Sequence, residues 1–251
     1  SLAGAALALS RRIRRQIPEE MVGVLLPPST AAVLANLAIL YAGKVPVNLN
    51  YTAGQTSLLS ALTQCGIKTV LTASKFVEKV NCEYIPGRVE LGELTAGNFK
   101  LSAVYHSFLA QLLPASVLFR WITAHTPDDA RLATIIFSSG STAEPKGVML
   151  THANISSNIE ALYDAFQIGK ADCILGVLPF FHSFGFTGTL WFPLLAGVRA
   201  FYHHNPLDAA QVGKLVAKHQ ATFLLGTPTF LHLYLKRCER EQFKTLKFVV
   251  V

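Results

Sequence analysis

The sequence predicts an α/β fold built from two βαβ-type subdomains, with mostly parallel sheets flanked by helices. Short apolar runs alternate with longer helical patterns along the whole chain, which is typical of βαβ units. The chain has 251 residues, of which 51% are hydrophobic and 15% charged. This length and composition are sufficient for a large buried core.

The first half of the chain is expected to form one α/β subdomain. Apolar runs predict strands at 21–26, 45–49 and 68–72, and helical patterns lie at 1–15, 30–41, 55–64 and 74–80. Ser29 or Thr30 can cap the second of these helices, and Gly43 can end it. Residues 81–98 are irregular, and residues 101–122 read as a helix interrupted at Pro114. A turn at 126–129 is the best boundary, so we expect subdomains at 1–126 and 127–251.

The second half repeats the alternation around a polar loop. Strands are predicted at 132–137, 173–178, 198–202, 221–225 and 246–251, with helices at 152–166, 184–195, 207–219 and 229–238. The last strand ends at Val251 without a turn or polar tail. Ligands in open α/β sheets bind beyond the carboxyl ends of the strands. We therefore expect the second subdomain to be truncated and the chain to be a fragment.

Basic residues outnumber acidic ones, and the net charge is +7. Much of the surplus lies in Arg11, Arg12, Arg14 and Arg15, which suit a solvated helix face or, alternatively, a peripheral contact with a membrane. No aromatic residues interleave with these arginines, so nucleic acid is not an expected partner. The apolar segment 101–113 could also lie on a bilayer surface, although core packing is the favoured interpretation.

The four cysteines are widely scattered, which argues against a zinc site and a disulfide framework. We predict no metal-ligating residues. The cysteine pattern suits a reducing compartment, so a cytoplasmic location is expected, at the inner face of the membrane if the contact above exists.

The residues between the strand at 132–137 and the helix at 152–166 are unusual for a core. Hydroxyls, glycines and one lysine suit a polyanion, because backbone N–H groups and hydroxyls can ring phosphate oxygens while the ammonium supplies charge. An ordinary surface turn is the alternative. The candidate phosphate ligands are Ser138, Ser139, Gly140, Ser141, Thr142, Lys146 and Gly147.

The order of these residues resembles the phosphate loop of the adenylate-forming superfamily, which includes acyl-CoA synthetases, luciferases and peptide-synthetase adenylation domains. The family pattern is hydroxyl, Ser, Gly, hydroxyl, hydroxyl, Gly, any residue, Pro, Lys, Gly, and Ala143 is the one departure. Segments 50–54, 179–185 and 226–231 are similar to the acyl-acyl-carrier-protein synthetase part of bacterial 2-acylglycerophosphoethanolamine acyltransferases. That likeness extends over about residues 23–251.

The resemblance implies an AMP-forming ligase that uses ATP and Mg²⁺. A fatty acid would be activated as an acyl-adenylate and transferred to the thiol of acyl carrier protein or CoA, with possible coupling to lysophospholipid acylation. The adenine-binding segment of the family would follow Val251. We therefore expect the 251-residue chain by itself to be inactive and to hold ATP weakly.

The resemblance also assigns roles to individual residues. Lys146 and Thr142 would neutralise phosphate charge during catalysis, and His182 would gate the pocket where acyl group, phosphate and thiol meet. Gly226 and Thr227 would lie near the acyl carboxylate. The segment around His182 also contains four phenylalanines that are either core or acyl-pocket wall: Phe180, Phe181, Phe184 and Phe186.

Two other function classes remain open on the sequence. One is a non-catalytic acyl- or phosphate-binding module, to which Ala143 points. The other is a membrane-surface scaffold that uses the arginines of 11–15 and segment 101–113.

Overall fold

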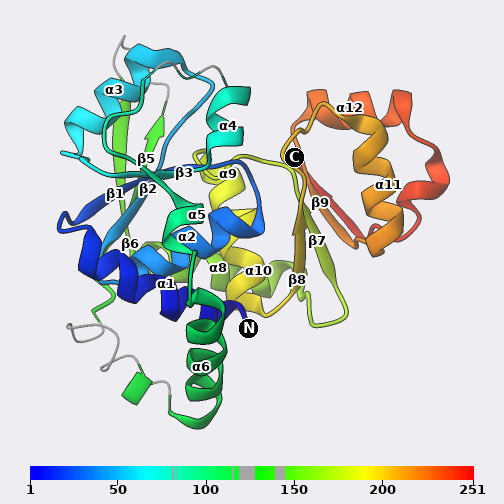
Figure 1. Cartoon of the computed structure of the whole chain (residues 1–251). Helices are drawn as coiled ribbons and strands as arrows, with labels where there is room; N and C mark the ends of the chain where they lie inside the picture. The colour runs from blue at the N-terminus through cyan, green and yellow to red at the C-terminus, as the bar shows by residue number, and fades with distance from the viewer. Residues whose placement is uncertain (81, 83, 115, 119–127, 139–144) are drawn as a thin grey trace. The chain divides into compact units, whose positions relative to one another are not determined.

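The computed structural model describes residues 1–80, 82, 84–114, 116–118, 128–138 and 145–251 (Figure 1). The chain divides into two compact units. The first comprises residues 1–26 and 31–152, and the second comprises residues 27–30 and 153–251. Both units are α/β, and the predicted fold class is confirmed.

The first unit is built on a four-stranded parallel sheet with the order β2-β1-β3-β4. Its elements are α1 (Leu2–Gln16), β1 (Met21–Leu25), α2 (Thr30–Tyr41), β2 (Val45–Asn48), α3 (Gly54–Gln64), β3 (Val70–Thr72), α4 (Ser74–Lys79), β4 (Arg88–Glu90), α5 (Leu91–Leu94) and α6 (Phe99–Leu112). Met21 pairs with Val45, and Gly23 pairs with Val70, so β1 lies at the centre. Of these elements, β4 and α5 fall in the stretch expected to be irregular.

Helices cover both faces of this sheet, α3 and α4 on one side and α1 and α2 on the other (Figure 1). The α3 side holds a cluster of buried side chains that includes Leu25, Val47 and Leu62. On the other side the amides of Asn36 and Asn48, both buried, donate to each other's oxygen at 3.1 and 2.8 Å. Each buried amide thus finds its partner, and the pair joins α2 to β2.

A hairpin of β5 (Leu132–Ser138) and β6 (Lys146–Thr151) belongs to the first unit. The two strands are antiparallel, and β5 packs on β2, where the Thr134 hydroxyl donates to the carbonyl of Pro46 at 2.7 Å. The boundary between the units therefore lies at His152/Ala153 and not in the turn at 126–129. Tertiary contacts of β5, which no local turn signal reports, hold this segment in the first unit.

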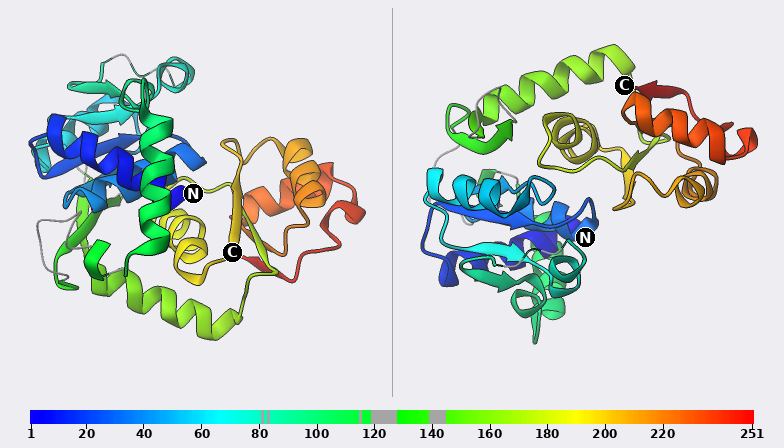
Figure 2. Two further views of the ribbon diagram at one scale, coloured as in Figure 1. Left: turned by 60° about the horizontal axis from the view of Figure 1, so that its bottom comes forward. Right: turned by 90° about the horizontal axis from the view of Figure 1, so that it is seen from above.

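The second unit has a parallel sheet with the order β10-β9-β7-β8. Its elements are α8 (His152–Phe166), β7 (Cys173–Gly176), α9 (Ser183–Gly185), the π-helix η1 (Phe186–Trp191), α10 (Phe192–Ala196), β8 (Arg199–Tyr202), α11 (Ala209–His219), β9 (Phe223–Leu225), α12 (Pro228–Arg237), the 3₁₀ turn η2 (Arg240–Phe243) and β10 (Phe248–Val250). The two faces of the sheet are covered by α11 and α12 on one side and by α8 and α10 on the other (Figures 1 and 2). Val212 and Val216 of α11 are fully buried, as are Phe192 of α10 and Phe223 of β9.

No helix in the described part of the chain is long and apolar enough to cross a bilayer.

Candidate functional site

The hairpin of the first unit brings the two ends of the predicted phosphate loop together. Ser138 and Lys146 are cross-strand partners in the β5–β6 register, and both are exposed. Directly opposed side chains of an antiparallel pair lie on the same face. The hydroxyl of Ser138 and the ammonium of Lys146 are therefore neighbours at the mouth of the loop. The predicted ligands Ser139, Gly140, Ser141 and Thr142 lie outside the described residues, as does Ala143.

Packing accounts for the glycine that follows the loop lysine. A Cβ atom on Gly147 would lie 2.9 Å from Cγ2 of Ile135 and 3.3 Å from Cε1 of Phe137 on the paired strand. On the other side of Lys146, the carbonyl of Pro145 accepts a hydrogen bond from Nε2 of Gln64 in α3 at 3.1 Å. The end of the loop is thus fixed on both sides of Lys146, while the lysine itself extends into solvent.

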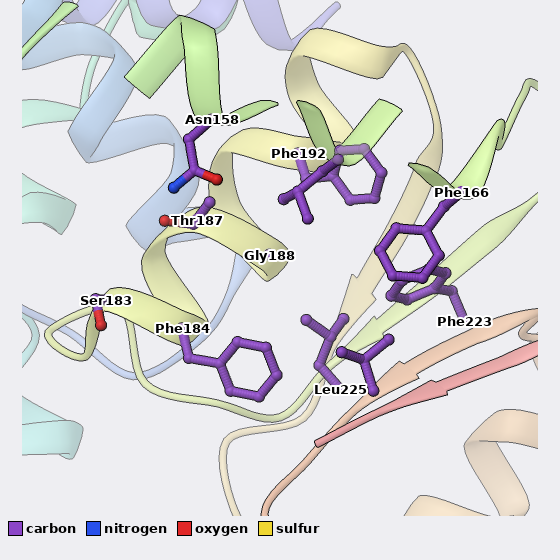
Figure 3. A pocket seen from close by; sticks show the side chains of 11 residues that line it. Asn158, Phe166, Ser183, Phe184, Thr187, Gly188, Phe192, Phe223 and Leu225 are labelled. Atoms are coloured by element: carbon purple, nitrogen blue, oxygen red, sulfur yellow. The ribbon is translucent and has the colours of Figure 1, made fainter. Parts of the chain in front are cut away.

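The second unit contains a cavity of about 290 Å³ on the face of its sheet that α8 covers (Figure 3). The cavity is lined by Asn158, Leu162, Phe166, Ser183, Phe184, Thr187, Gly188, Phe192, Phe223, Leu225 and Val250. These residues come from α8, from the α9–η1–α10 segment, from both ends of β9 and from the carboxyl end of β10. Leu225 and Val250 lie at the carboxyl ends of their strands, which is where ligands of parallel α/β sheets bind.

The cavity has a polar side and an apolar side. Asn158, Ser183 and Thr187 place their polar atoms on one side, and aromatic rings gather on the other (Figure 3). The rings of Phe166 and Phe223 are 5.0 Å apart and perpendicular, and the ring of Phe192 lies 6.5 Å and 6.0 Å from them. These are favourable aromatic geometries. The arrangement fits an amphipathic ligand with one polar end and an apolar tail.

A π-helical turn forms part of the cavity lining. The η1 segment follows α9 directly, and the Thr189 hydroxyl of η1 donates to the carbonyl of Gly185 in α9 at 2.7 Å. π-Helical turns are rare in proteins overall, and those that occur are often found at functional sites. The wider turn places Thr187 and Gly188 on the cavity.

The structure shows which of the four phenylalanines around His182 belong to the core and which line the cavity. Phe180, Phe181 and Phe186 are almost fully buried and belong to the core. Phe184 lines the cavity, and its ring points towards Leu225 (Figure 3).

His182 lies at the N-terminal end of α9, one residue before the lining residue Ser183. His182 is exposed, and its ring lies 4.5 Å from the ring of Phe181. Partial burial lowers the pKa of the imidazole below its usual value. His182 is therefore in its neutral form near pH 7. The gating role remains a prediction.

Gly226 and Thr227 form the turn between β9 and α12. The Gly226 N–H donates to the carbonyl of Val250 at 3.0 Å, and the Thr227 hydroxyl accepts from the N–H of Phe230 at 3.4 Å as the N-cap of α12. Both residues thus have structural roles next to Leu225, which lines the cavity. Their contact with an acyl group remains a prediction.

Sequence reasoning missed the contribution of α8 to the cavity. Asn158, Leu162 and Phe166 are spaced four residues apart and line it as one helical stripe. The spacing was visible in the sequence, but it could not show whether that stripe faces the core or a cavity.

The match to protein families covers nearly the whole chain: a family model described as "AMP-binding enzyme" matches residues 2–251. The chain belongs to the AMP-binding enzyme family. Two curated relatives of this AMP-binding enzyme are similar to it over much of its length. A long-chain-fatty-acid–AMP ligase of Mycolicibacterium smegmatis is 28% identical over 181 residues, which is 71% of this chain and 27% of the relative. A long-chain-fatty-acid–CoA ligase of Bacillus subtilis is 25% identical over 236 residues, 84% of this chain and 41% of the relative. The chain thus spans less than half the length of either.

Solved structures share the fold of this AMP-binding enzyme. An O-succinylbenzoate coenzyme A synthetase of Bacillus subtilis in complex with AMP aligns with a TM-score of 0.76 at 21% identity, covering 99% of this chain and 59% of the other. A fatty acid AMP ligase of Legionella pneumophila aligns with a TM-score of 0.74 at 21% identity, covering 98% and 41%.

At the hairpin, the chemistry of the exposed ammonium of Lys146 and the hydroxyl of Ser138 fits phosphate oxygens such as those of ATP. Among the described residues, no three His, Cys, Asp or Glu side chains come together as metal ligands. Mg²⁺ that accompanies ATP is held largely by phosphate oxygens and water, so it needs no such cluster.

Proposed function

We propose that this chain carries the phosphate loop and the acyl pocket of an ATP-dependent fatty-acid-activating ligase. The observation that carries the proposal is the cavity of about 290 Å³ with a polar side and a side of three aromatic rings, in a chain of the AMP-binding family. The cavity fits a carboxylate with an apolar tail. Two relatives whose names specify long-chain fatty acids support the same substrate class.

In the first step a carboxylate oxygen of the fatty acid attacks the α-phosphorus of ATP. The bond from that phosphorus to the bridging oxygen breaks, and pyrophosphate leaves with the electron pair. Charge builds up on the leaving pyrophosphate, so cationic and hydrogen-bonding groups near it lower the barrier. Lys146 supplies a positive charge there, and the hydroxyls of 138–142 supply donors. Mg²⁺ would add further charge neutralisation at the phosphates.

The apolar side of the cavity binds the tail. Each methylene moved from water into such a site stabilises the complex by about 0.8 kcal/mol. Phe166, Phe192 and Phe223 offer aromatic surface for this burial, while Asn158 and Thr187 lie on the side where polar atoms gather. The tail therefore orients the carboxylate.

In the second step a thiol sulfur attacks the acyl carbonyl carbon, and AMP leaves as the acyl–oxygen bond breaks. We propose acyl carrier protein or CoA as the thiol donor, with the acyl group passing on to a lysophospholipid in the whole protein. The likeness of segments 50–54, 179–185 and 226–231 to acyl-acyl-carrier-protein synthetases supports this acceptor class. We assign the gate to His182, and its place one residue before the lining residue Ser183 and its lowered pKa support this assignment.

Calorimetric titration of the chain with MgATP tests the phosphate site. Lys146→Ala should weaken MgATP binding by roughly 10- to 100-fold, because a hydrogen bond to a charged group contributes about 1.5–3 kcal/mol. Because Lys146 is exposed, the thermal unfolding midpoint should stay unchanged. Lys170→Ala, at another exposed lysine, is the matched control and should bind MgATP as the wild type does.

Equal MgATP affinity of the wild type and the Lys146→Ala variant would refute the assignment of this loop. Absence of any MgATP binding by the wild type would count equally against it. A fluorescent fatty acid titrated into the same variant should bind unchanged, because the cavity lies in the other unit.

A further inference from the structure

The helix α6 presents its large apolar side chains to solvent. Five of them are more than half exposed, with fractions of 75% at Leu101, 69% at Val104, 54% at Tyr105, 59% at Phe108 and 62% at Leu112. Their spacing places them within an arc of about 100° on one side of the helix. The expectation that this segment packs into the core is therefore wrong for these residues.

The side of α6 that faces α1 includes His106 and Ser107, and the helix is fixed there against α1 (Figure 2). The hydroxyl and amino groups of Ser1 both bond to Oγ of Ser107, at 3.0 and 3.1 Å. A Cβ atom on Gly4 would overlap Ser107 and the carbonyl of Ala103, so the two helices approach as closely as a glycine allows. This contact fixes the rotation of α6 and holds its apolar side outward.

The arginines of α1 do not act as a single cluster. Arg12 is bound within the protein: its guanidinium donates to the carbonyls of Leu94 and Ala96 at 2.9 and 2.8 Å and to Oδ1 of Asn98 at 2.7 Å. It also lies 5.4 Å from the centre of the Phe99 ring. Arg12 thus anchors the start of α6, which the sequence pattern did not show.

Other basic residues are exposed on the same pair of helices. They are Arg11, Arg14 and Arg15 of α1 and Lys100 of α6, and Nη1 of Arg11 lies 3.4 Å from Nε2 of His106 on α6. Neither α1 nor α6 contains an aspartate or a glutamate. The helix pair thus combines an exposed apolar stripe on α6 with exposed basic residues and no acidic ones, and the chain carries a net charge of +7.

We propose that α6 docks on the surface of an anionic lipid bilayer. The stripe of Leu101, Val104, Tyr105, Phe108 and Leu112 would enter the boundary between headgroups and acyl chains, and the arginines of α1 would meet lipid phosphates. Amphipathic helices with a basic polar border bind bilayers in this way. Basic residues near an anionic surface strengthen such binding. The helix has 14 residues, which is too short to span a bilayer, so it lies in the interface plane.

Charge decides between a bilayer and a second copy of the chain. A second copy of the chain carries the same net charge of +7, and like charges oppose its approach. An anionic bilayer neutralises the same charges. Exposed apolar patches of this kind mark interaction sites in soluble folds.

Co-sedimentation with vesicles tests the proposal on the wild-type chain. Vesicles of phosphatidylcholine with about 30 mol% phosphatidylglycerol should bind the protein, because their surface is negatively charged. Pure phosphatidylcholine should bind it at least about tenfold more weakly, and binding to the anionic vesicles should fall with salt because charges are screened.

Two sets of variants separate the apolar and the electrostatic contributions. Leu101→Ser with Phe108→Ser should reduce partitioning at least about tenfold, because two large apolar side chains no longer enter the apolar layer. Leu235→Ser is the matched control, because Leu235 is 79% exposed on α12, and it should bind as the wild type does. Arg14→Gln with Arg15→Gln should lower binding to the anionic vesicles alone.

A third variant measures insertion directly without a polar substitution. Phe108→Trp should gain fluorescence quenching by brominated lipids relative to the wild type, whereas Leu235→Trp should gain none. The proposal is overturned if the wild type binds neither kind of vesicle. It is also overturned if brominated lipid quenches Phe108→Trp no more than it quenches the wild type. It is also overturned if sedimentation shows a dimer that the Leu101→Ser/Phe108→Ser variant converts to monomer while vesicle binding is absent.

Discussion

Gly188 of the π-helical turn and Leu225 at the end of β9 touch so closely that a Cβ atom on Gly188 would overlap Cδ2 of Leu225. Both residues line the cavity. The absence of a side chain at Gly188 therefore sets how near the turn comes to the sheet, and with it the width of the proposed acyl pocket. The contact between Gly188 and Leu225 thus sets the distance between the turn and the strand end, and this distance sets the width of the cavity.

Gly188→Ala is expected to destabilise the second unit and narrow the cavity. The added methyl group must push either the turn or Leu225 aside, and overpacking of this kind costs about 1–3 kcal/mol. Chemical denaturation should show that loss, and fatty-acid affinity should fall with it. Gly169→Ala is the control, because a Cβ atom at Gly169 meets nothing within 4 Å. A Gly188→Ala variant as stable as the control would contradict the close contact.

Phe166→Leu should shift the chain-length preference of the pocket towards longer fatty acids. Phe166 is half-buried and closes the aromatic side of the cavity, with its ring perpendicular to that of Phe223 at 5.0 Å. Leucine is smaller than phenylalanine and leaves space at that end for additional methylenes. Competition binding with saturated fatty acids of about 6 to 16 carbons measures the optimal chain length. Affinity depends on chain length because each buried methylene adds about 0.8 kcal/mol. Tyr163→Leu, on the exposed part of α8, should leave the optimum where it is.

Local pattern was sufficient to predict the parallel sheets, because buried strands such as Val70–Thr72 and Cys173–Gly176 are short apolar runs between helical segments. It was not sufficient for β4 and β6. Arg88–Glu90 has one apolar residue between two charges and is a strand only because it pairs with β3. Lys146–Thr151 is largely exposed and is held by β5. Such strands are determined by partners distant in the sequence, which periodicity does not report.

The residues of the candidate site also fall into those that local sequence indicated and those that only tertiary packing shows. Residue types and order indicated the loop around Lys146 and the segment around His182, because their chemistry is unusual for a core. The lining residues Phe166 and Leu225 are ordinary apolar residues, and only tertiary packing separates them from the buried Phe186. The apolar stripe of α6 shows the opposite error, since its composition suggested core, whereas its side chains are exposed and Ser107 of the same helix contacts Ser1.

Thr227→Ala should separate the capping role of Thr227 from a role in binding. The hydroxyl accepts from the N–H of Phe230, and loss of an N-cap of this kind costs about 1 kcal/mol. Thr227→Ser keeps the hydroxyl and should restore stability. If Thr227 also contacts the acyl carboxylate, fatty-acid affinity should fall in the alanine variant and recover in the serine variant. Loss of stability with unchanged affinity would assign Thr227 to structure alone.

His182 should titrate below the usual range of histidine. Partial burial beside Phe181 penalises the imidazolium, so the pKa is lowered in the folded chain. Because the unfolded chain then binds the proton more readily, the contribution of His182 to stability is present above the unfolded pKa of about 6.5 and declines as the pH falls below it. The ring Cε1 resonance in NMR titrations, assigned by its loss in His182→Gln, should move with a midpoint below about 6.5. A midpoint above that value would show that the ring is stabilised as a cation, which is the wrong form for an uncharged gate beside an apolar cavity.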